Sequence, residues 1–148
     1  MIIREWTLED AKGARLAKFM KQFEQASAQV KVDVEYTFKK YYSMMEKGMA
    51  HILIAEEEGE ILGAIGFIVG PDLHEEKKVA VETFWFVAPE HRGIGAHLFY
   101  AFEKRATELG CKRKAMVHMV DSYPESLKAF YEKNGYHLAE CHYIKDDE

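Results

Sequence analysis

The residues with the clearest potential for chemistry lie between Val79 and His97, where an apolar run is followed by a glycine-containing turn. The apolar run ends at Ala88-Pro89, and Arg92-Gly93-Ile94-Gly95 then opens a segment with helical periodicity. Backbone N–H groups in the first turn of a helix lack intrahelical partners, and the helix dipole adds positive potential there. Glycines let an anion approach the backbone, so the pattern predicts a phosphate-binding turn. An ordinary tight turn before a helix is the alternative that these residues leave open.

Glu82 is the one acidic residue inside the apolar run from Val79 to Val87. A carboxyl group in such a strand needs water, a partner or a pocket, because burying an unpaired charge is costly. Glu82 is therefore a candidate general base, and pairing with a neighbouring cation is the structural alternative. Asp121, His118 and His74 are weaker candidates for the same role.

The elements that must position these residues follow from hydrophobic periodicity. Thr7 with Asp10 is a plausible helix N-cap pair, Asp33 can cap a second helix, and Ser122 with Glu125 forms a capping box for the last helix. The glycines of the 61–69 segment, Gly63 and Gly66, predict a bulge or a close backbone approach. Strands are predicted at 2–6, 51–56, 61–69, 79–87, 115–120 and 136–144, with helices after Thr7, after Asp33, over 94–109 and up to Gly135. The predicted order is β-α-α-β-β-β-α-β-α-β, an α/β mixed sheet with helices on both faces.

Length and composition favour one globular domain over residues 1–148. The 20 basic and 25 acidic residues give a net charge of −5, which argues against generic nucleic-acid binding. This charge would suit a cationic substrate, but a net charge that only keeps the protein in solution is the favoured explanation. Cys111 and Cys141 have no metal-type spacing and favour a reducing compartment, and the histidines form no zinc motif. No signal peptide or membrane span is expected, so the predicted location is the cytoplasm.

A second motif runs from Pro124 to Tyr136, about thirty-five residues after the glycine turn, and ends in Phe130-Tyr131-Glu132-Lys133-Asn134-Gly135-Tyr136. Together the two motifs resemble the GNAT family of acyl-CoA N-acetyltransferases. The turn looks like the family's pyrophosphate motif, Q/R-x-x-G-x-G/A, and the later segment is similar to its x-F-Y-x-K-x-G-F/Y helix. The resemblance extends over nearly the whole chain, from Ile3-Arg4-Glu5-Trp6-Thr7 onward, and implies the GNAT fold.

The resemblance also implies acetyl-CoA as cosubstrate, with no metal. Its phosphates would lie on Arg92, Gly93, Ile94, Gly95 and Ala96, although Glu90 occupies the family's Gln/Arg position and the turn is about two residues short. Its pantetheine arm would lie between Phe86-Val87 and a strand around Met116-Val117, with the N–H of Val87 donating to the thioester oxygen. Tyr123 stands where relatives often have an asparagine that contacts the arm.

By the same resemblance, Tyr131 is the general acid that meets the CoA sulfur, and Glu82 lies near the usual place of the base. The implied reaction is direct attack of a primary amine, on a small molecule or a peptide, without an acyl-enzyme. A non-catalytic CoA-binding sensor or interaction module on the same fold is the alternative, motivated by the irregular phosphate turn. No nucleic-acid or membrane partner is expected, and a homodimer is possible because dimers are common in the family.

Overall fold

The computed structural model describes residues 1–26, 31–119 and 124–147. It consists of two compact units, Met1–Val117 and His118–Glu148. Each unit is described by itself below. The prediction of a single domain over residues 1–148 stays a prediction.

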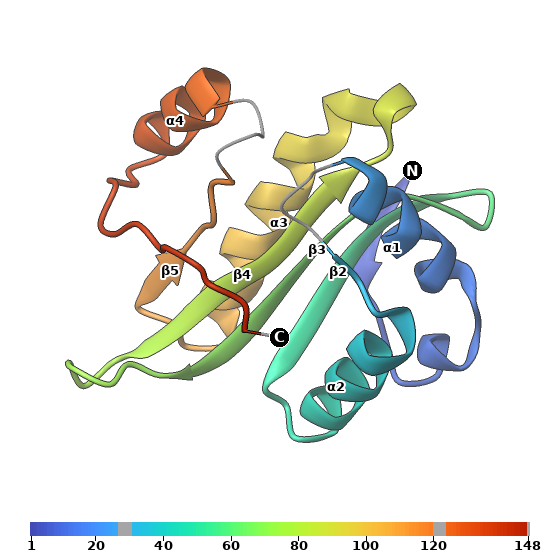
Figure 1. Cartoon of the computed structure of the whole chain (residues 1–148), viewed down its shortest axis with the longest axis horizontal. Coiled ribbons are helices and arrows are strands. Elements are labelled where there is room, and N and C mark those ends of the chain that lie inside the picture. Colours follow the sequence, from blue (N-terminus) through green and yellow to red (C-terminus); the bar gives the residue numbers. More distant parts are fainter. Residues whose placement is uncertain (27–30, 120–123, 148) are drawn as a thin grey trace. The chain divides into compact units, whose positions relative to one another are not determined.

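The first unit is built on a five-stranded mixed sheet in the order β1-β2-β3-β4-β5 (Figure 1). Neighbours from β1 to β4 pair antiparallel, whereas β5 runs parallel to β4. The strands are β1 (Ile2–Glu5), β2 (Ala50–Glu57), β3 (Glu60–Pro71), β4 (Lys78–Val87) and β5 (Arg113–Ala115). The β2–β3 connection is a tight hairpin, and both Glu58 and Gly59 in it have positive φ angles. This agrees with the break between the strands predicted at 51–56 and 61–69.

Helices cover both faces of this sheet, as predicted (Figure 1). On one face, the rings of Phe84 and Phe86 in β4 pack against Phe19 and Phe23 of α1 (Arg15–Ala26), with centroids 5.3–6.0 Å apart. The edge of the Tyr41 ring in α2 (Val34–Glu46) meets Phe84 on the same face. Successive strand residues point to opposite faces, which explains why a continuous apolar run is needed in β4.

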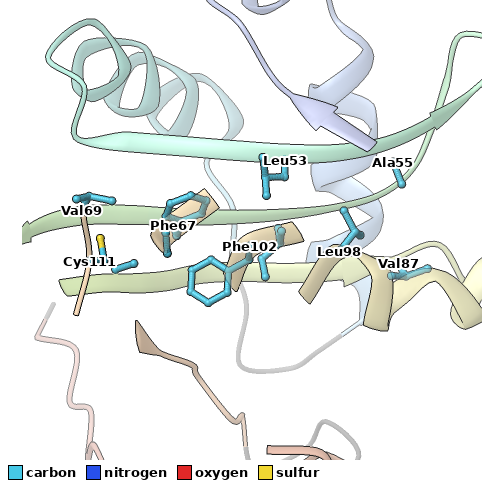
Figure 2. Packing of buried hydrophobic residues seen from close by; sticks show 11 residues of the cluster. Leu53, Ala55, Phe67, Val69, Val87, Leu98, Phe102 and Cys111 are labelled. Carbon is cyan, nitrogen blue, oxygen red and sulfur yellow. The ribbon is translucent and has the colours of Figure 1, made fainter. Parts of the chain in front are cut away.

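The other face of the sheet packs on α3 (Gly95–Glu108), which the sequence predicted at 94–109. Leu98, Phe102 and Ala106 of α3 are fully buried against apolar side chains from β2, β3 and β4 (Figure 2). Phe67 and Phe102 form an edge-to-face pair with centroids 5.0 Å apart at the centre of this cluster. A helix whose apolar side chains recur every three or four positions presents one face to such a core.

One of two capping signals read from the sequence is confirmed. Thr7 and Asp10 do exchange hydrogen bonds, but they do not cap a helix: the N-cap of the 3-10 turn η1 (Asp10–Lys12) is Glu9, without a side-chain cap, and α1 begins only at Arg15. Asp33 caps α2 by accepting the N–H of Tyr36 at 3.0 Å. The helix ends at Glu46, and Gly48 follows with a φ of 71°.

In the second unit the described element is α4 (Pro124–Lys133), followed by Gly135 with a φ of 88°. The predicted capping residue Ser122 lies outside the described residues. The strand predicted at 136–144 is not present, and Leu138, Tyr143 and Ile144 are exposed. A strand requires a ladder partner as well as a suitable sequence, and this unit has no second extended segment to supply one in its described part.

The strand predicted at 115–120 is also corrected. Its observed counterpart, β5, starts earlier and ends at Ala115. No helix in the described residues is both long and apolar enough to span a membrane.

Candidate functional site

The candidate site lies where β4 and β5 separate. Parallel pairing joins Val79, Ala80 and Val81 to Arg113, Lys114 and Ala115 and then stops, although β4 continues to Val87. In the described part of the chain, β4 therefore has no strand partner on this side beyond Val81. We call this opening, between residues 82–87 and 116–117, the fork.

Glu82 lies at the base of the fork. Glu82 is only 5% exposed, and its side-chain Oε1 accepts a hydrogen bond from the backbone N–H of Val117 at 3.3 Å. Burial raises the pKa of Glu82 to about 8, and the Val117 N–H offsets this only in part. No lysine or arginine of the described residues forms an ion pair with it, so the predicted alternative of pairing with a cation is not what the structure shows. A carboxyl whose pKa lies near neutrality is suited to proton transfer.

A β-bulge interrupts the regular pairing of β4 with β3 directly after Glu82. The register shifts between Gly66 and Phe67, so Gly66 is opposite Phe84 while Phe67 is opposite Glu82. Thr83 is the extra residue, and its hydroxyl is hydrogen-bonded to the hydroxyl of Tyr41. Bulges re-aim side chains and end regular pairing, which is what happens at the fork.

Gly66 makes this bulge possible. A Cβ atom at this position would lie 2.3 Å from the Phe84 ring and 3.0 Å from the Tyr41 hydroxyl oxygen. The ring of Phe84 therefore occupies the space that any other residue at position 66 would fill. The bulge and close approach predicted from the glycines of β3 are confirmed.

Val87 directs its backbone N–H toward the fork. The next residue, Ala88, donates its own N–H to Leu62 on the β3 side at 2.9 Å. Because N–H groups alternate sides along an extended strand, those of Val87 and Phe86 point to opposite edges. Val87 is thus placed to donate to a ligand in the fork, whereas the backbone of Phe86 faces β3 and its ring lies on the α1 face.

The glycine turn is a 3-10 helix, η2 (Pro89–Ile94), that runs into α3. No side chain caps α3, since its N-cap residue is Ile94. The guanidinium of Arg92 lies over the Phe86 ring, 5.8 Å from its centroid, and Glu90 is exposed. Gly95 lies beside the Trp85 ring, whereas nothing approaches the Cβ position of Gly93 within 4 Å.

Tyr131 lies on α4 in the second unit. Its ring packs against His118 edge-to-face at 6.1 Å and against Tyr136 at 5.9 Å. A buried Nε2 atom of His118 has no hydrogen-bond partner among the described residues. Tyr123 and Asp121 lie outside the described residues, so the structure does not test their predicted roles.

Metal ligation has no support in the described ranges 1–26, 31–119 and 124–147. No three side chains of the types that bind metals gather there.

Comparison with known proteins agrees with this architecture. The model of the acetyltransferase (GNAT) family matches residues 8–136. The chain belongs to the GNAT family. No curated protein matches its sequence.

Solved acetyltransferase structures match all or nearly all of the chain. A probable acetyltransferase is 20% identical with a TM-score of 0.76, and all of both chains are covered. A ribosomal-protein-alanine N-acetyltransferase from Brucella melitensis biovar Abortus 2308 is 19% identical with a TM-score of 0.73, covering 99% of this chain and 100% of that one. A predicted acetyltransferase with acetyl-CoA, from Clostridium acetobutylicum, is 15% identical with a TM-score of 0.74, covering 99% and 95%. At these identities the likeness shows the fold.

Among the residues predicted from the GNAT resemblance, the first unit brings Glu82 and Val117 into contact at the base of the fork, and Val87 lies at the end of the same strand as Glu82. It places Arg92, Gly93, Ile94, Gly95 and Ala96 at the entry to α3. Sequence reasoning did not find Thr83, the contact of the Tyr41 hydroxyl with it, or the contact of Val117 with Glu82. Gly66 was the sequence signal for the contact of Thr83 with Tyr41, because a glycine inside an apolar strand marks a bulge or the close approach of another group.

Proposed function

We propose that this GNAT protein is an N-acetyltransferase that moves an acetyl group from acetyl-CoA to a primary amine by direct attack. The observation that carries the proposal is the fork, which offers a directed backbone N–H at Val87 and a buried carboxyl with a raised pKa at Glu82. The Clostridium acetobutylicum structure with acetyl-CoA supports the choice of cosubstrate.

The cosubstrate is proposed to bind along β4. Its pyrophosphate would lie at the start of α3, where first-turn N–H groups and the helix dipole favour an anion and the Arg92 guanidinium adds positive charge. Its pantetheine arm would extend the sheet in the fork, in the place that a longer β5 would take. Val87 would then donate its N–H to the thioester oxygen, where negative charge develops during attack.

Proton transfers complete the proposed reaction. The acceptor amine loses a proton to the Glu82 carboxylate, directly or through water, and its nitrogen forms the new bond to the acetyl carbon. The carbon–sulfur bond breaks, and the departing thiolate takes the hydroxyl proton of Tyr131, a role implied by the family resemblance. Substrate would be a small-molecule or peptide amine, and the two free cysteines suit a cytoplasmic setting.

Calorimetric titration with acetyl-CoA, CoA and ATP tests the binding part of the proposal. We expect both CoA species to bind and ATP not to bind. Thiol release from acetyl-CoA, followed with a chromogenic disulfide over a panel of amines, tests the reaction. Absence of CoA binding would contradict the proposal.

A non-catalytic CoA-binding module is the second candidate. The shortened turn, folded as a 3-10 helix and carrying the exposed Glu90, favours it because that turn departs from the family's pattern. Binding of CoA with no thiol release for any amine in the panel would support this alternative.

A further inference from the structure

The β4–β5 ladder ends next to the hydrogen bond between the Val117 N–H and the side chain of Glu82. The carbonyl of Lys78 accepts the N–H of Lys112 at 2.8 Å, so Lys78 faces β5. Carbonyls alternate sides along a strand, and those of Ala80 and Glu82 therefore face β5 as well. The pair Val81–Ala115 sets the register, which would place Glu82 opposite Met116.

Within a regular parallel ladder, a carbonyl accepts from the residue that follows its partner on the next strand. The bond from Lys112 to Lys78 lies before the first ladder pair, Val79–Arg113, and shows only the side to which Lys78 points. The donor for the Glu82 carbonyl would therefore be the N–H of Val117. That N–H goes instead to the side-chain Oε1 of Glu82, at 3.3 Å. The side chain of Glu82 thus takes the donor that its own backbone would use, and pairing stops at this residue.

The bulge beside Glu82 fixes this arrangement from the opposite edge of β4. Thr83 is held by the hydroxyl of Tyr41, and the Phe84 ring fills the space above Gly66. Burial raises the pKa of Tyr41 to about 12, so its hydroxyl stays protonated and can remain a hydrogen-bond donor. The bulge on the β3 edge of β4 and the side-chain contacts on the face covered by α2 therefore hold the strand at the point where the Glu82 carboxyl meets Val117.

We propose that Glu82 is a positioning residue that holds the fork open: its carboxyl withholds the Val117 N–H from the β4 backbone and so keeps room for an extended ligand between the two strands. This role is separate from proton transfer, because any side chain with an oxygen acceptor at this position could fulfil it. The part that concerns the ligand rests on the proposed binding of CoA in the fork.

The test compares Glu82→Gln with Glu82→Ala. The amide of glutamine keeps an oxygen that can accept the Val117 N–H, whereas alanine has none. We expect Glu82→Gln to bind CoA within about twofold of the unchanged protein, and Glu82→Ala to bind about tenfold more weakly, as for loss of one well-placed interaction. Calorimetry with CoA alone measures this without an acceptor amine.

A second readout does not depend on CoA. In Glu82→Ala, NMR should show new backbone contacts between residue 82 and Met116-Val117, with slower hydrogen exchange at the Val117 amide, because the ladder lengthens. In Glu82→Gln, neither should change. Faster or unaltered exchange in Glu82→Ala without new backbone contacts would overturn the proposal.

The exposed first residue of β3 provides a matched control: Glu60→Ala also removes a strand glutamate, but one that precedes the residues of β3 paired with β4, and it should leave both readouts unchanged. If the unchanged protein does not bind CoA, the proposed function fails, while the NMR comparison still decides whether Glu82 holds the strands apart. If CoA binds equally well to all variants, the positioning role fails and the proposed function stands.

Discussion

At the scale of single residues, the protonation of Glu82 has a consequence for stability. Its pKa is about 8 in the folded protein, against an ordinary value of 4.5. Between these two pH values the folded state holds more protons than the unfolded state, so the free energy of unfolding falls as pH rises. The effect is largest at alkaline pH, where a buried charge must form.

We therefore expect Glu82→Gln to gain stability relative to the unchanged protein as pH rises from 5 to 9. The gain should be roughly 2–5 kcal/mol, set by the pKa difference. Urea unfolding at a series of pH values measures it. The exposed Glu60→Gln should show no such trend, and a constant difference between Glu82→Gln and the unchanged protein would contradict the raised pKa.

Tyr131 allows a second prediction at the residue scale. Tyr131→Phe removes the hydroxyl and keeps the ring that packs against His118 and Tyr136. If the hydroxyl protonates the leaving thiolate, kcat should fall by roughly 10²-fold while the Kd for CoA stays unchanged.

Steady-state rates and calorimetry separate these two quantities. Tyr136→Phe is the matched control, since it removes a neighbouring phenol from the same unit. Equal kcat values for Tyr131→Phe and the unchanged protein would leave Tyr131 with a packing role only.

At the scale of elements, Gly66 couples β3 to the bulge of β4. Gly66→Ala would place a methyl group 2.3 Å from the Phe84 ring, which also packs against α1 and α2. We expect a loss of about 1–3 kcal/mol in the free energy of unfolding, as for overpacking a core. CoA binding should weaken too, because the bulge shapes the fork.

Gly70→Ala is the control for this change. It lies in the same strand, and nothing approaches its Cβ position within 4 Å. Its effect on unfolding should stay within about 0.5 kcal/mol. If urea unfolding gave the same free energy of unfolding for Gly66→Ala and Gly70→Ala, the close approach at Gly66 would not contribute to stability.

The start of α3 supports a prediction about charge. Arg92 is exposed and lies over Phe86, at the proposed phosphate site. Arg92→Ala should weaken CoA binding by roughly tenfold or more, since hydrogen bonds to charged groups contribute about 1.5–3 kcal/mol. The affinity of Arg92→Ala for CoA should also depend less on salt concentration than that of the unchanged protein.

Lys104→Ala, an exposed cation later in α3, is the comparison for Arg92→Ala. Both variants lose one positive charge, but only Arg92 lies at the helix start. Equal affinities in the two variants, measured by calorimetry at two salt concentrations, would place the phosphates elsewhere.

At the scale of the whole molecule, ligand binding should raise thermal stability. A ligand specific for the folded state, at a hundred times its Kd, adds about 2.7 kcal/mol. For a protein of this length, that corresponds to a rise of roughly 5–10 °C in Tm. We expect it with acetyl-CoA and with CoA, but not with ATP, in a thermal-shift titration; a rise with all three would indicate binding of nucleotide phosphates in general.

Much of the first unit could be predicted because its signals are local. The Asp33 cap, the helical periodicity of α3 and the apolar run of β4 each involve residues within a few positions of one another. The phosphate turn and the Tyr131 segment were also contiguous motifs. By contrast, the strand predicted at 136–144 failed because pairing depends on a partner that a local pattern does not contain.

The sequence by itself determined the family, the order of the main strands and helices up to the last helix, and the candidates Glu82, Arg92 and Tyr131, because periodicity and short motifs are properties of neighbouring residues. Only the tertiary structure decided where β5 stops, since that depends on Glu82 meeting the Val117 amide across thirty-five positions of the chain. It also decided the bulge, which needs Gly66, Phe84 and Tyr41 from three elements to meet in one place. Contacts of this kind arise from packing, and no local pattern records them.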